Sequence, residues 1–199
     1  MSKPIDRRVR RTQHQLRCAL EKLMQTKSVS TITVKELCLE CDINRGTFYL
    51  HYRDVYDLLH TIEQEMLAEF EKVINCFKPG EHFGGKVPSK SMCAMFEFFA
   101  ANSAMCCVLL CKNGDMSFTQ RVKGVVHNQM NGPWREYFGS EETEMSTYAF
   151  SFIVSGCIGM LQQWLENGAV TPPQMMAILM ENILVKGISA LGTTGDDKI

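Results

Sequence analysis

The sequence predicts an all-α protein, with an N-terminal three-helix helix-turn-helix domain followed by a larger helical bundle. Two observations predict this fold class. Apolar residues recur every three or four positions through most of the 199 residues, and no convincing pair of strands interrupts them. An apolar content of 45% lets a chain of this length bury a core. We expect residues 1–53 to form the first domain, 54–77 a long connecting helix and 78–199 the C-terminal domain.

Two amphipathic helices are expected in the first part of the chain. Residues 7–26 place Leu16 and Leu20 on one apolar stripe, with Arg and Gln side chains opposite. Asp54 is a good N-cap for a longer helix, whose apolar stripe continues to about Phe77. Because this long helix belongs to both halves of the chain, it is expected to connect them.

Two short helices lie between the amphipathic ones. Thr33 is a good N-cap, and Glu36 three residues later completes a capping box. Residues 42–44 form a turn, and the next helix spans about residues 45–51. Phe48 should point inward, which leaves the opposite side of this helix facing outward. Two short helices joined by a tight turn are the helix-turn-helix arrangement.

The C-terminal domain is expected to be a helical bundle that begins after the Gly- and Pro-rich segment 78–89, the clearest break in the chain. The helical patterns that follow span about residues 90–102, 104–112, 115–138, 142–167 and 172–191. The pattern between Tyr148 and Leu161 is apolar almost all round, so its helix should be central or packed on two sides.

Charge is distributed unevenly along the chain. Up to Arg53 there are eleven Lys and Arg residues and five Asp and Glu residues, a balance of +6, whereas the remainder carries −7. The N-terminal part can therefore approach a polyanion. The first residues lack the apolar segment of a secretory signal, and no segment has the roughly 18 uninterrupted apolar residues of a membrane span. We expect a cytoplasmic protein with no membrane partner.

The segment ITVKELCLECDINRGTFYLHYRDVYDLL resembles the DNA-binding region of the TetR family of transcriptional regulators. The matching positions are Thr33, Leu37, Ile43, Gly46, Thr47, Phe48, Tyr49 and Tyr52. The resemblance covers about residues 9–60, and two positions depart from it. Asp42 replaces the usual turn glycine, although Asp adopts a left-handed conformation at less cost than most residues. Val55 replaces a usual lysine, so Arg53 is expected to take over that phosphate contact.

This resemblance implies a homodimer that binds a palindromic operator in double-stranded DNA, with repression as the expected outcome. Arg45 and Thr47 would read bases, Arg45 through two hydrogen bonds to a guanine. The full set of expected DNA contacts is Thr33, Lys35, Asn44, Arg45, Gly46, Thr47, Tyr49, His51, Tyr52 and Arg53, with Arg7, Arg10 and Arg11 along the backbone or in the minor groove.

The segments SFTQRVKG and SGCIGMLQQWLENGAVTPPQM resemble the C-terminal region of a TetR-like subgroup that includes regulators of dihydroxyacetone kinase operons. That resemblance makes Gly156, Trp164, Gly168 and Pro172 framework positions. Two terminal helices from each chain would form a four-helix dimer interface. Its expected residues are Gly156, Gly159, Met176, Leu179, Ile183 and Ile188.

A small-molecule effector of unknown identity is expected in the C-terminal domain, because Met and Phe side chains together favour an adaptable apolar cavity. The expected cavity walls are Met92, Met95, Phe96, Phe99, Met105, Phe118, Val122, Met130, Trp134 and Phe152. The alternative for each of them is an ordinary core position, which is the more frequent role of such stripes.

The sequence predicts no catalytic residue, cofactor or metal site, and the protein is not expected to be an enzyme. No Gly-rich phosphate loop or nucleophile elbow is present. Cys38 and Cys41 have metal-like spacing but no second pair nearby. Cys106, Cys107 and Cys111 could sense oxidants only as exposed thiolates, and their apolar neighbours indicate burial. A different class of function is a coactivator or protein-interaction module that regulates without a small-molecule ligand, and salt-dependent duplex binding would separate the two.

Overall fold

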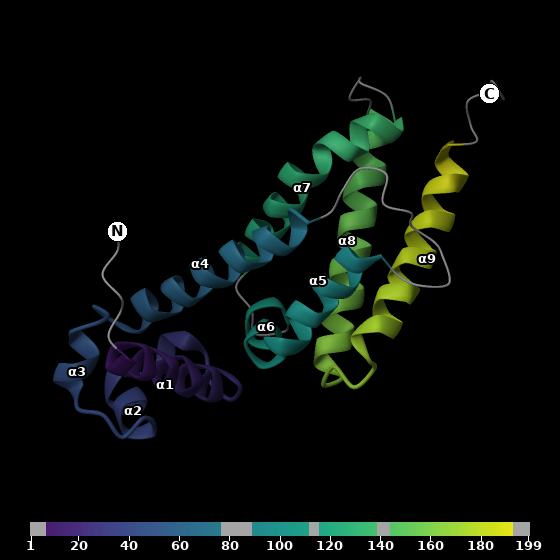
Figure 1. The fold of residues 1–199 in the computed structure, drawn as a ribbon. Coiled ribbons are helices and arrows are strands. Elements are labelled where there is room, and N and C mark those ends of the chain that lie inside the picture. Colours follow the sequence, from purple (N-terminus) through teal and green to yellow (C-terminus); the bar gives the residue numbers. More distant parts are fainter. Residues whose placement is uncertain (1–6, 77–88, 112–115, 139–143, 193–199) are drawn as a thin grey trace. The chain divides into compact units, whose positions relative to one another are not determined.

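The computed structural model describes residues 7–76, 89–111, 116–138 and 144–192. Within these ranges every regular element is helical, which confirms the predicted all-α class (Figure 1). The α-helices are α1 (Arg7–Met24), α2 (Val34–Glu40), α3 (Arg45–Tyr49), α4 (Val55–Ile74), α5 (Lys90–Ala101), α6 (Ser103–Leu110), α7 (Met116–Phe138), α8 (Glu144–Glu166) and α9 (Pro173–Gly192). A short 3-10 helix, Val29–Thr31, lies between α1 and α2.

The chain divides into two compact units, Met1–Met66 and Leu67–Ile199. The division falls inside α4, the helix that the sequence predicts to connect the two halves. Asp54 begins this helix as expected, because its Oδ1 accepts the backbone N–H of Asp57 over 2.8 Å. Each unit has its own buried core.

The first unit is built around Phe48 and a set of leucines. Leu16 and Leu20 of α1, Leu37 of α2 and Leu58 of α4 are fully buried, as is Phe48 of α3. Each such side chain contributes about 1.5–3 kcal/mol through its removal from water. Helix α1 packs on α2, and α2 packs on α3. The inward orientation predicted for Phe48 is confirmed.

The core of the second unit lies where α5 packs along α9 and α6 packs against α7 and α8. The rings of Phe96 and Trp164 meet edge to face with centroids 5.4 Å apart, and the Trp164 indole N–H donates to the carbonyl of Thr171 over 2.9 Å. Glu181 of α9 is buried and accepts the backbone N–H of Ser89 over 2.7 Å. Helix α9 therefore holds the residue that caps α5.

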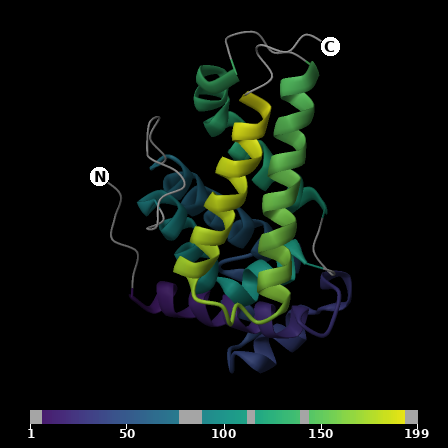
Figure 2. The same ribbon diagram turned by 90° about the vertical axis from the view of Figure 1, so that its right-hand side faces the viewer.

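Helices α8 and α9 run side by side in opposite directions at one surface of this unit (Figure 2). Helix α8 buries one side, where Val154 and Ile158 are each 8% exposed. Its other side is open, with Tyr148 64% and Phe152 80% exposed. The expectation that α8 is central is therefore wrong, because a single chain covers only one of its apolar sides, and packing on a second side stays a prediction.

The connection from α8 to α9 uses two left-handed residues. Gly168 has a φ of 77° and Ala169 a φ of 52°. Their backbone N–H groups donate to the carbonyls of Leu165 and Trp164, each over 2.9 Å. These bonds satisfy the last carbonyls of α8, as in a Schellman motif. Gly168 is needed at its position because an L side chain rarely adopts this conformation.

Candidate nucleic-acid interface

Helix α2 begins at the predicted capping box. The backbone N–H of Glu36 donates to Thr33 Oγ1 over 3.2 Å, and the backbone N–H of Thr33 donates to Glu36 Oε2 over 2.9 Å. The Thr33 hydroxyl also donates to Glu36 Oε2 over 2.9 Å. This arrangement satisfies backbone donors that the helix leaves without partners. The Thr33 hydroxyl, which the sequence assigns to DNA contact, is therefore engaged in starting α2.

The turn between α2 and α3 passes through a left-handed residue. Asp42 has a φ of 53°, and the backbone N–H of Ile43 donates to the carbonyl of Cys38 over 3.0 Å. A left-handed conformation is costly for most L residues and less so for Asp. The expectation that Asp42 takes the role of the usual turn glycine is confirmed.

Asn44 begins α3 as its N-cap. Asn44 Oδ1 accepts the backbone N–H groups of Gly46 over 2.7 Å and of Thr47 over 3.4 Å. A Cβ atom on Gly46 would lie 3.0 Å from that same oxygen, which is a tight contact. Both residues therefore fix the start of the helix, and this is a positioning role that the sequence did not distinguish from direct DNA contact.

The outer side of α3 carries Arg45, Thr47 and Tyr49. Arg45 is exposed, Thr47 is half-buried and Tyr49 is 58% exposed, whereas Phe48 between them is fully buried. Residues four apart share a helix face, so Arg45 and Tyr49 lie together. Helix α3 lies beside the beginning of α4 in Figure 1. The predicted base-reading residues are thus on an open surface of a helix that is anchored from behind.

The residues that are expected to contact phosphates differ in their exposure to solvent. Lys35 is exposed and His51 is half-buried. Tyr52 is only 7% exposed, and its ring centroid lies 5.9 Å from that of Phe48. Burial also raises the pKa of the Tyr52 hydroxyl. The Tyr52 ring thus packs in the core of the first unit, and the phosphate contact expected of Tyr52 stays a prediction.

Arg53 is tied to the start of α4. Its backbone N–H donates to Asp57 Oδ2 over 2.9 Å, and its Nη2 lies 3.2 Å from Asp57 Oδ1. The backbone bond and then the guanidinium lower the pKa of the Asp57 carboxyl. The Arg53 side chain is nevertheless 87% exposed. A guanidinium has five N–H donors, so it can bind Asp57 and still donate outward.

Lysines neutralise the two acidic residues of α2. Lys22 Nζ lies 2.5 Å from Glu40 Oε1, and Lys27 Nζ lies 2.5 Å from Glu36 Oε1. Hydrogen bonds from Lys27 and then from Thr33 lower the pKa of the Glu36 carboxyl to about 2. Paired carboxylates repel a polyanion less than free ones, so these pairs favour the approach of α2 to nucleic acid.

Helix α1 begins with a basic turn. Arg7, Arg10 and Arg11 are exposed, and the first turn contains no acidic residue. Cations at the N-terminus of a helix are unfavourable, because the helix dipole already places a partial positive charge there. A bound polyanion would relieve this repulsion. The exposed arginines of α1 therefore suit a polyanion, as does the exposed Arg45 on the outer side of α3.

Comparison with known proteins identifies the family. The TetR_C_8 family model, described as a transcriptional regulator C-terminal region, matches residues 87–186, which is half of the chain. The chain belongs to the TetR family of transcriptional regulators. The sequence is also 29% identical over 182 residues to the Uncharacterized HTH-type transcriptional regulator YxbF of Bacillus subtilis (strain 168). That match covers 88% of this chain and 45% of the curated relative, so the chain spans less than half of its length.

Solved structures share the TetR fold at low sequence identity. A TetR transcriptional regulator from Streptococcus agalactiae 2603V has a TM-score of 0.59 and 21% identity, and the match covers 94% of this chain and 96% of that one. The fatty acid degradation regulator FadR from Bacillus halodurans has a TM-score of 0.57 and 14% identity, with 99% and 100% covered. The dihydroxyacetone kinase operon activator DhaS has a TM-score of 0.52 and 14% identity, with 90% and 97% covered.

The residues predicted to wall an effector cavity in this TetR-family regulator are mostly core positions. Among them, Met92, Phe96, Phe99, Met105, Phe118 and Val122 are at most 4% exposed, and Met95 is half-buried. Phe152 is 80% exposed, so its assignment to a cavity wall is wrong. The side chains of Met130 and Trp134 lie outside the described residues.

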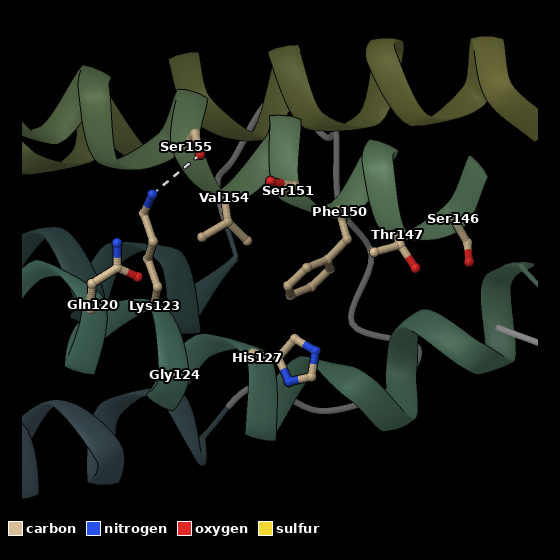
Figure 3. A pocket seen from close by; sticks show the side chains of 10 residues that line it. All are labelled: Gln120, Lys123, Gly124, His127, Ser146, Thr147, Phe150, Ser151, Val154 and Ser155. Atoms are coloured by element: carbon tan, nitrogen blue, oxygen red, sulfur yellow. Dashed lines mark hydrogen bonds between the residues drawn. The ribbon is translucent and has the colours of Figure 1, made fainter. Parts of the chain in front are cut away.

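A cavity of about 360 Å³ is present elsewhere, between α7 and α8 (Figure 3). Lys123 and His127 reach into it from α7, and Phe150, Ser151 and Ser155 face them from α8. None of the predicted wall residues lines it. Sequence patterns offered little sign of this site, because its walls are mostly polar or small residues from two segments that are separated along the chain.

The predicted dimer residues of the regulator fall into two groups. Gly156 and Gly159 are exposed on α8, and Leu179 and Ile183 on α9 are 48% and 53% exposed. Met176 is 7% exposed, which corrects its assignment, because it packs inside its own chain. The side chain of Ile188 lies outside the described residues. The sequence missed four exposed members of the same surface, which are Met145, Tyr148 and Phe152 of α8 and Met175 of α9.

The surroundings of Cys38, Cys41 and Cys111 do not favour a reactive thiolate. Burial raises the pKa of Cys38, and it raises the pKa of Cys41 to about 11. Burial and the neighbouring Cys107 raise the pKa of Cys111 to about 12. Redox sensing needs the opposite shift. Among the described residues, no group of three or more His, Cys, Asp or Glu side chains is placed to hold a metal ion.

Proposed function

We propose that this TetR-family regulator is a repressor that binds a palindromic operator as a homodimer and is released by a small-molecule effector in its second unit. The observation that carries the proposal is the outer side of α3. Arg45 is exposed there, directly after the Asn44 cap, while Phe48 anchors the opposite side. An arginine held in this way can donate two hydrogen bonds to O6 and N7 of a guanine.

The remaining contacts position the protein on the duplex. The Thr47 methyl group can meet a thymine methyl, and exposed Lys35 can bind a phosphate. The arginines at the start of α1 can follow the backbone or enter the minor groove. Because Glu36 and Glu40 are paired with lysines, the acids of α2 oppose this docking only weakly.

The exposed surface of α8 and α9 supports the homodimer. We define the dimer stripe as Met145, Tyr148, Phe152, Gly156 and Gly159 of α8 with Met175, Leu179 and Ile183 of α9. Large apolar side chains that cluster on one surface usually meet a partner. Glycines within the stripe let a second helix approach closely. Two copies related by a twofold axis would bury the stripe in a four-helix interface.

A twofold dimer explains how an effector could release DNA. Two α3 helices would enter successive major grooves of a palindrome about 34–36 Å apart. An effector that binds better to a dimer with another spacing would weaken DNA binding by its differential affinity for the two states. Helix α4 is the natural connection, because it runs through the division between the two units.

We place this regulator in the cytoplasm, where operators are accessible. Of the described helices, α8 has the length and composition of a possible membrane span, with 22% of the apolar window buried. Helices α5 and α6 pass the same test only as a pair bent by 87°. We attribute the exposed apolar side of α8 to the dimer stripe rather than to a membrane span.

A protein-interaction module is the second candidate function. Leu39 and Leu50 are 72% and 81% exposed on the helix-turn-helix, where apolar side chains suit a protein partner. Val55, which replaces a usual phosphate-binding lysine, is only 5% exposed and offers no contact to DNA. In this alternative, the basic surface of the first unit would have no duplex to bind.

The salt dependence of duplex binding separates these candidates. A duplex is first selected from a randomised library, and its affinity for the full chain is measured across a range of KCl concentrations. A DNA-binding protein should show log K falling linearly with log salt, because phosphate contacts release counterions. An absence of affinity for any double-stranded fragment at low ionic strength would favour the interaction module and reject the proposal.

A further inference from the structure

The cavity between α7 and α8 has a chemistry of its own. Lys123 and His127 are the titratable side chains in its wall, and none of the lining residues, all from the described part of the chain, is acidic. Opposite them, α8 contributes the hydroxyls of Thr147, Ser151 and Ser155. These three residues recur every four positions, so they lie along one side of the helix. The Lys123 ammonium faces Ser155 at one end of this row, and Thr147 lies at the other end (Figure 3).

Lys123 is the central group of this site. Its ammonium crosses from α7 to α8 and donates to Ser155 Oγ over 3.4 Å, as Figure 3 shows. This is a long hydrogen bond for an ammonium group, which has three N–H donors. Lys123 is half-buried, so part of its surroundings is protein rather than water. An anion placed in the cavity would give its charge a closer and stronger partner than a neutral hydroxyl.

The cavity also has an apolar wall. The rings of His127 and Phe150 meet edge to face with centroids 5.3 Å apart, and Val154 beside them is 8% exposed. A volume of about 360 Å³ lies at the lower end of the range for small-molecule sites. The site is suited to a compact molecule with a carbon skeleton, hydroxyl groups and a negative charge.

We propose that the cavity between α7 and α8 binds a small hydroxylated organic anion, whose carboxylate or phosphate lies against Lys123 and whose hydroxyls bind the serines of α8. Helical register places these serines beside the dimer stripe, which occupies the next side of α8 through Tyr148 and Phe152. A bound anion would join α7 to α8 at the edge of this stripe. A consequence for operator binding rests on the proposed function, whereas occupancy of the cavity does not.

The test uses three probes with similar carbon skeletons, which are glucose 6-phosphate, gluconate and neutral glucose. Each is titrated calorimetrically into the full-length protein without DNA, and the melting temperature is measured in parallel. We expect both anions to bind and raise the melting temperature, and glucose to do neither. Lys123→Gln should weaken anion binding about tenfold or more, because a charge-assisted hydrogen bond is lost. The matched control is Lys72→Gln, which removes an exposed lysine from α4 and should keep the wild-type affinity.

Three results would overturn the proposal. They are no binding of either anion, equal binding of glucose, and unchanged anion affinity in Lys123→Gln. Ser155→Ala is a second variant. It should weaken anion binding by removing one hydroxyl, and it leaves the charge of the site unchanged. Duplex affinity is measured on the same samples without probe. Anion binding by a protein without duplex affinity would reject the proposed function and keep the site, and the reverse pattern would reject the site alone.

Discussion

Asn44 Oδ1 accepts the backbone N–H of Gly46 over 2.7 Å, and this bond begins the helix that carries Arg45. The cap fixes the direction in which the first turn of α3 points. Residues on either side of Arg45 therefore position it, although neither needs to touch a base. This relationship makes the start of α3 the most informative place for substitutions.

Replacement of Asn44 tests the cap. Asn44→Ala should lower the free energy of unfolding by about 1 kcal/mol, because the backbone N–H groups of Gly46 and Thr47 lose their acceptor. Asn44→Asp keeps an acceptor and should retain stability, while its negative charge weakens duplex binding. Urea unfolding followed by circular dichroism measures the first effect, and fluorescence anisotropy with a labelled duplex the second. Equal stability of wild type and Asn44→Ala would show that the cap contributes nothing.

The left-handed turn residue offers a stabilising substitution. Asp42 has a φ of 53°, so Asp42→Gly should raise the free energy of unfolding by roughly 0.5 kcal/mol, while Asp42→Ala should lower it by a similar amount. Asp42→Asn is the matched control, because Asn tolerates this conformation and removes only the charge. Urea midpoints rank the variants. A destabilising effect of Asp42→Gly would show that backbone strain at Asp42 does not limit the stability of the turn.

The capping box of α2 should make the free energy of unfolding depend on pH. Hydrogen bonds from Lys27 and Thr33 hold the pKa of Glu36 at about 2, below its usual 4.5. A carboxyl with a depressed folded pKa stabilises the fold above about pH 4.5, and this contribution is lost as pH falls through about 2. Glu36→Gln should therefore flatten the pH dependence of stability within this window. Urea midpoints across that pH range measure it, and identical profiles for both proteins would reject the role of Glu36.

The dimer stripe can be tested with a single charge. Phe152→Asp should convert a dimer of twice 22.6 kDa into a monomer of 22.6 kDa, because each interface would then bury two unpaired carboxylates. Phe152 is 80% exposed in the single chain, so the unit should remain folded. Val170→Asp is the control, since Val170 is 83% exposed in the turn after α8 and outside the stripe. Light scattering after size-exclusion chromatography gives the mass, and a dimeric Phe152→Asp protein would contradict the assignment.

Local sequence chemistry predicted the helix-turn-helix well. The capping box at Thr33 and the left-handed Asp42 both depend on neighbours within a few residues. Such interactions are visible in the sequence because each motif has a fixed spacing. The same reasoning placed Asp54 at the start of α4. These local predictions were confirmed because no long-range packing was needed to decide them.

Predictions that depended on long-range packing were less successful. Three such residues are Phe152, Tyr52 and Met176, which are all large and either amphipathic or apolar. Their residue type predicts that they are buried, but it does not indicate which part of the protein, or which partner, covers them. Phe152 is exposed on the single chain, whereas Tyr52 and Met176 are buried inside their own units. Hydrophobic periodicity likewise indicated two apolar sides for α8 without indicating that one of them faces outward.

The cavity between α7 and α8 was beyond the reach of sequence patterns for a related reason. Lys123 and Ser155 are 32 residues apart, and each alone resembles an ordinary surface residue. Only the packing of α7 on α8 brings them together. The Met and Phe stripes instead mark the core, where such side chains most often lie.

Arg45 tests most directly whether the outer side of α3 reads a DNA groove. Affinities for a selected operator and for a scrambled duplex are compared between wild type, Arg45→Ala and Arg45→Lys. Arg45→Ala should lose about 1–3 kcal/mol of discrimination while the protein stays folded, since Arg45 is exposed. Arg45→Lys should keep the affinity for the scrambled duplex and lose part of the discrimination, because an ammonium can reach guanine O6 and N7 but lacks the rigid planar fork of a guanidinium. Unchanged sequence preference in both variants would contradict a base-reading role for α3.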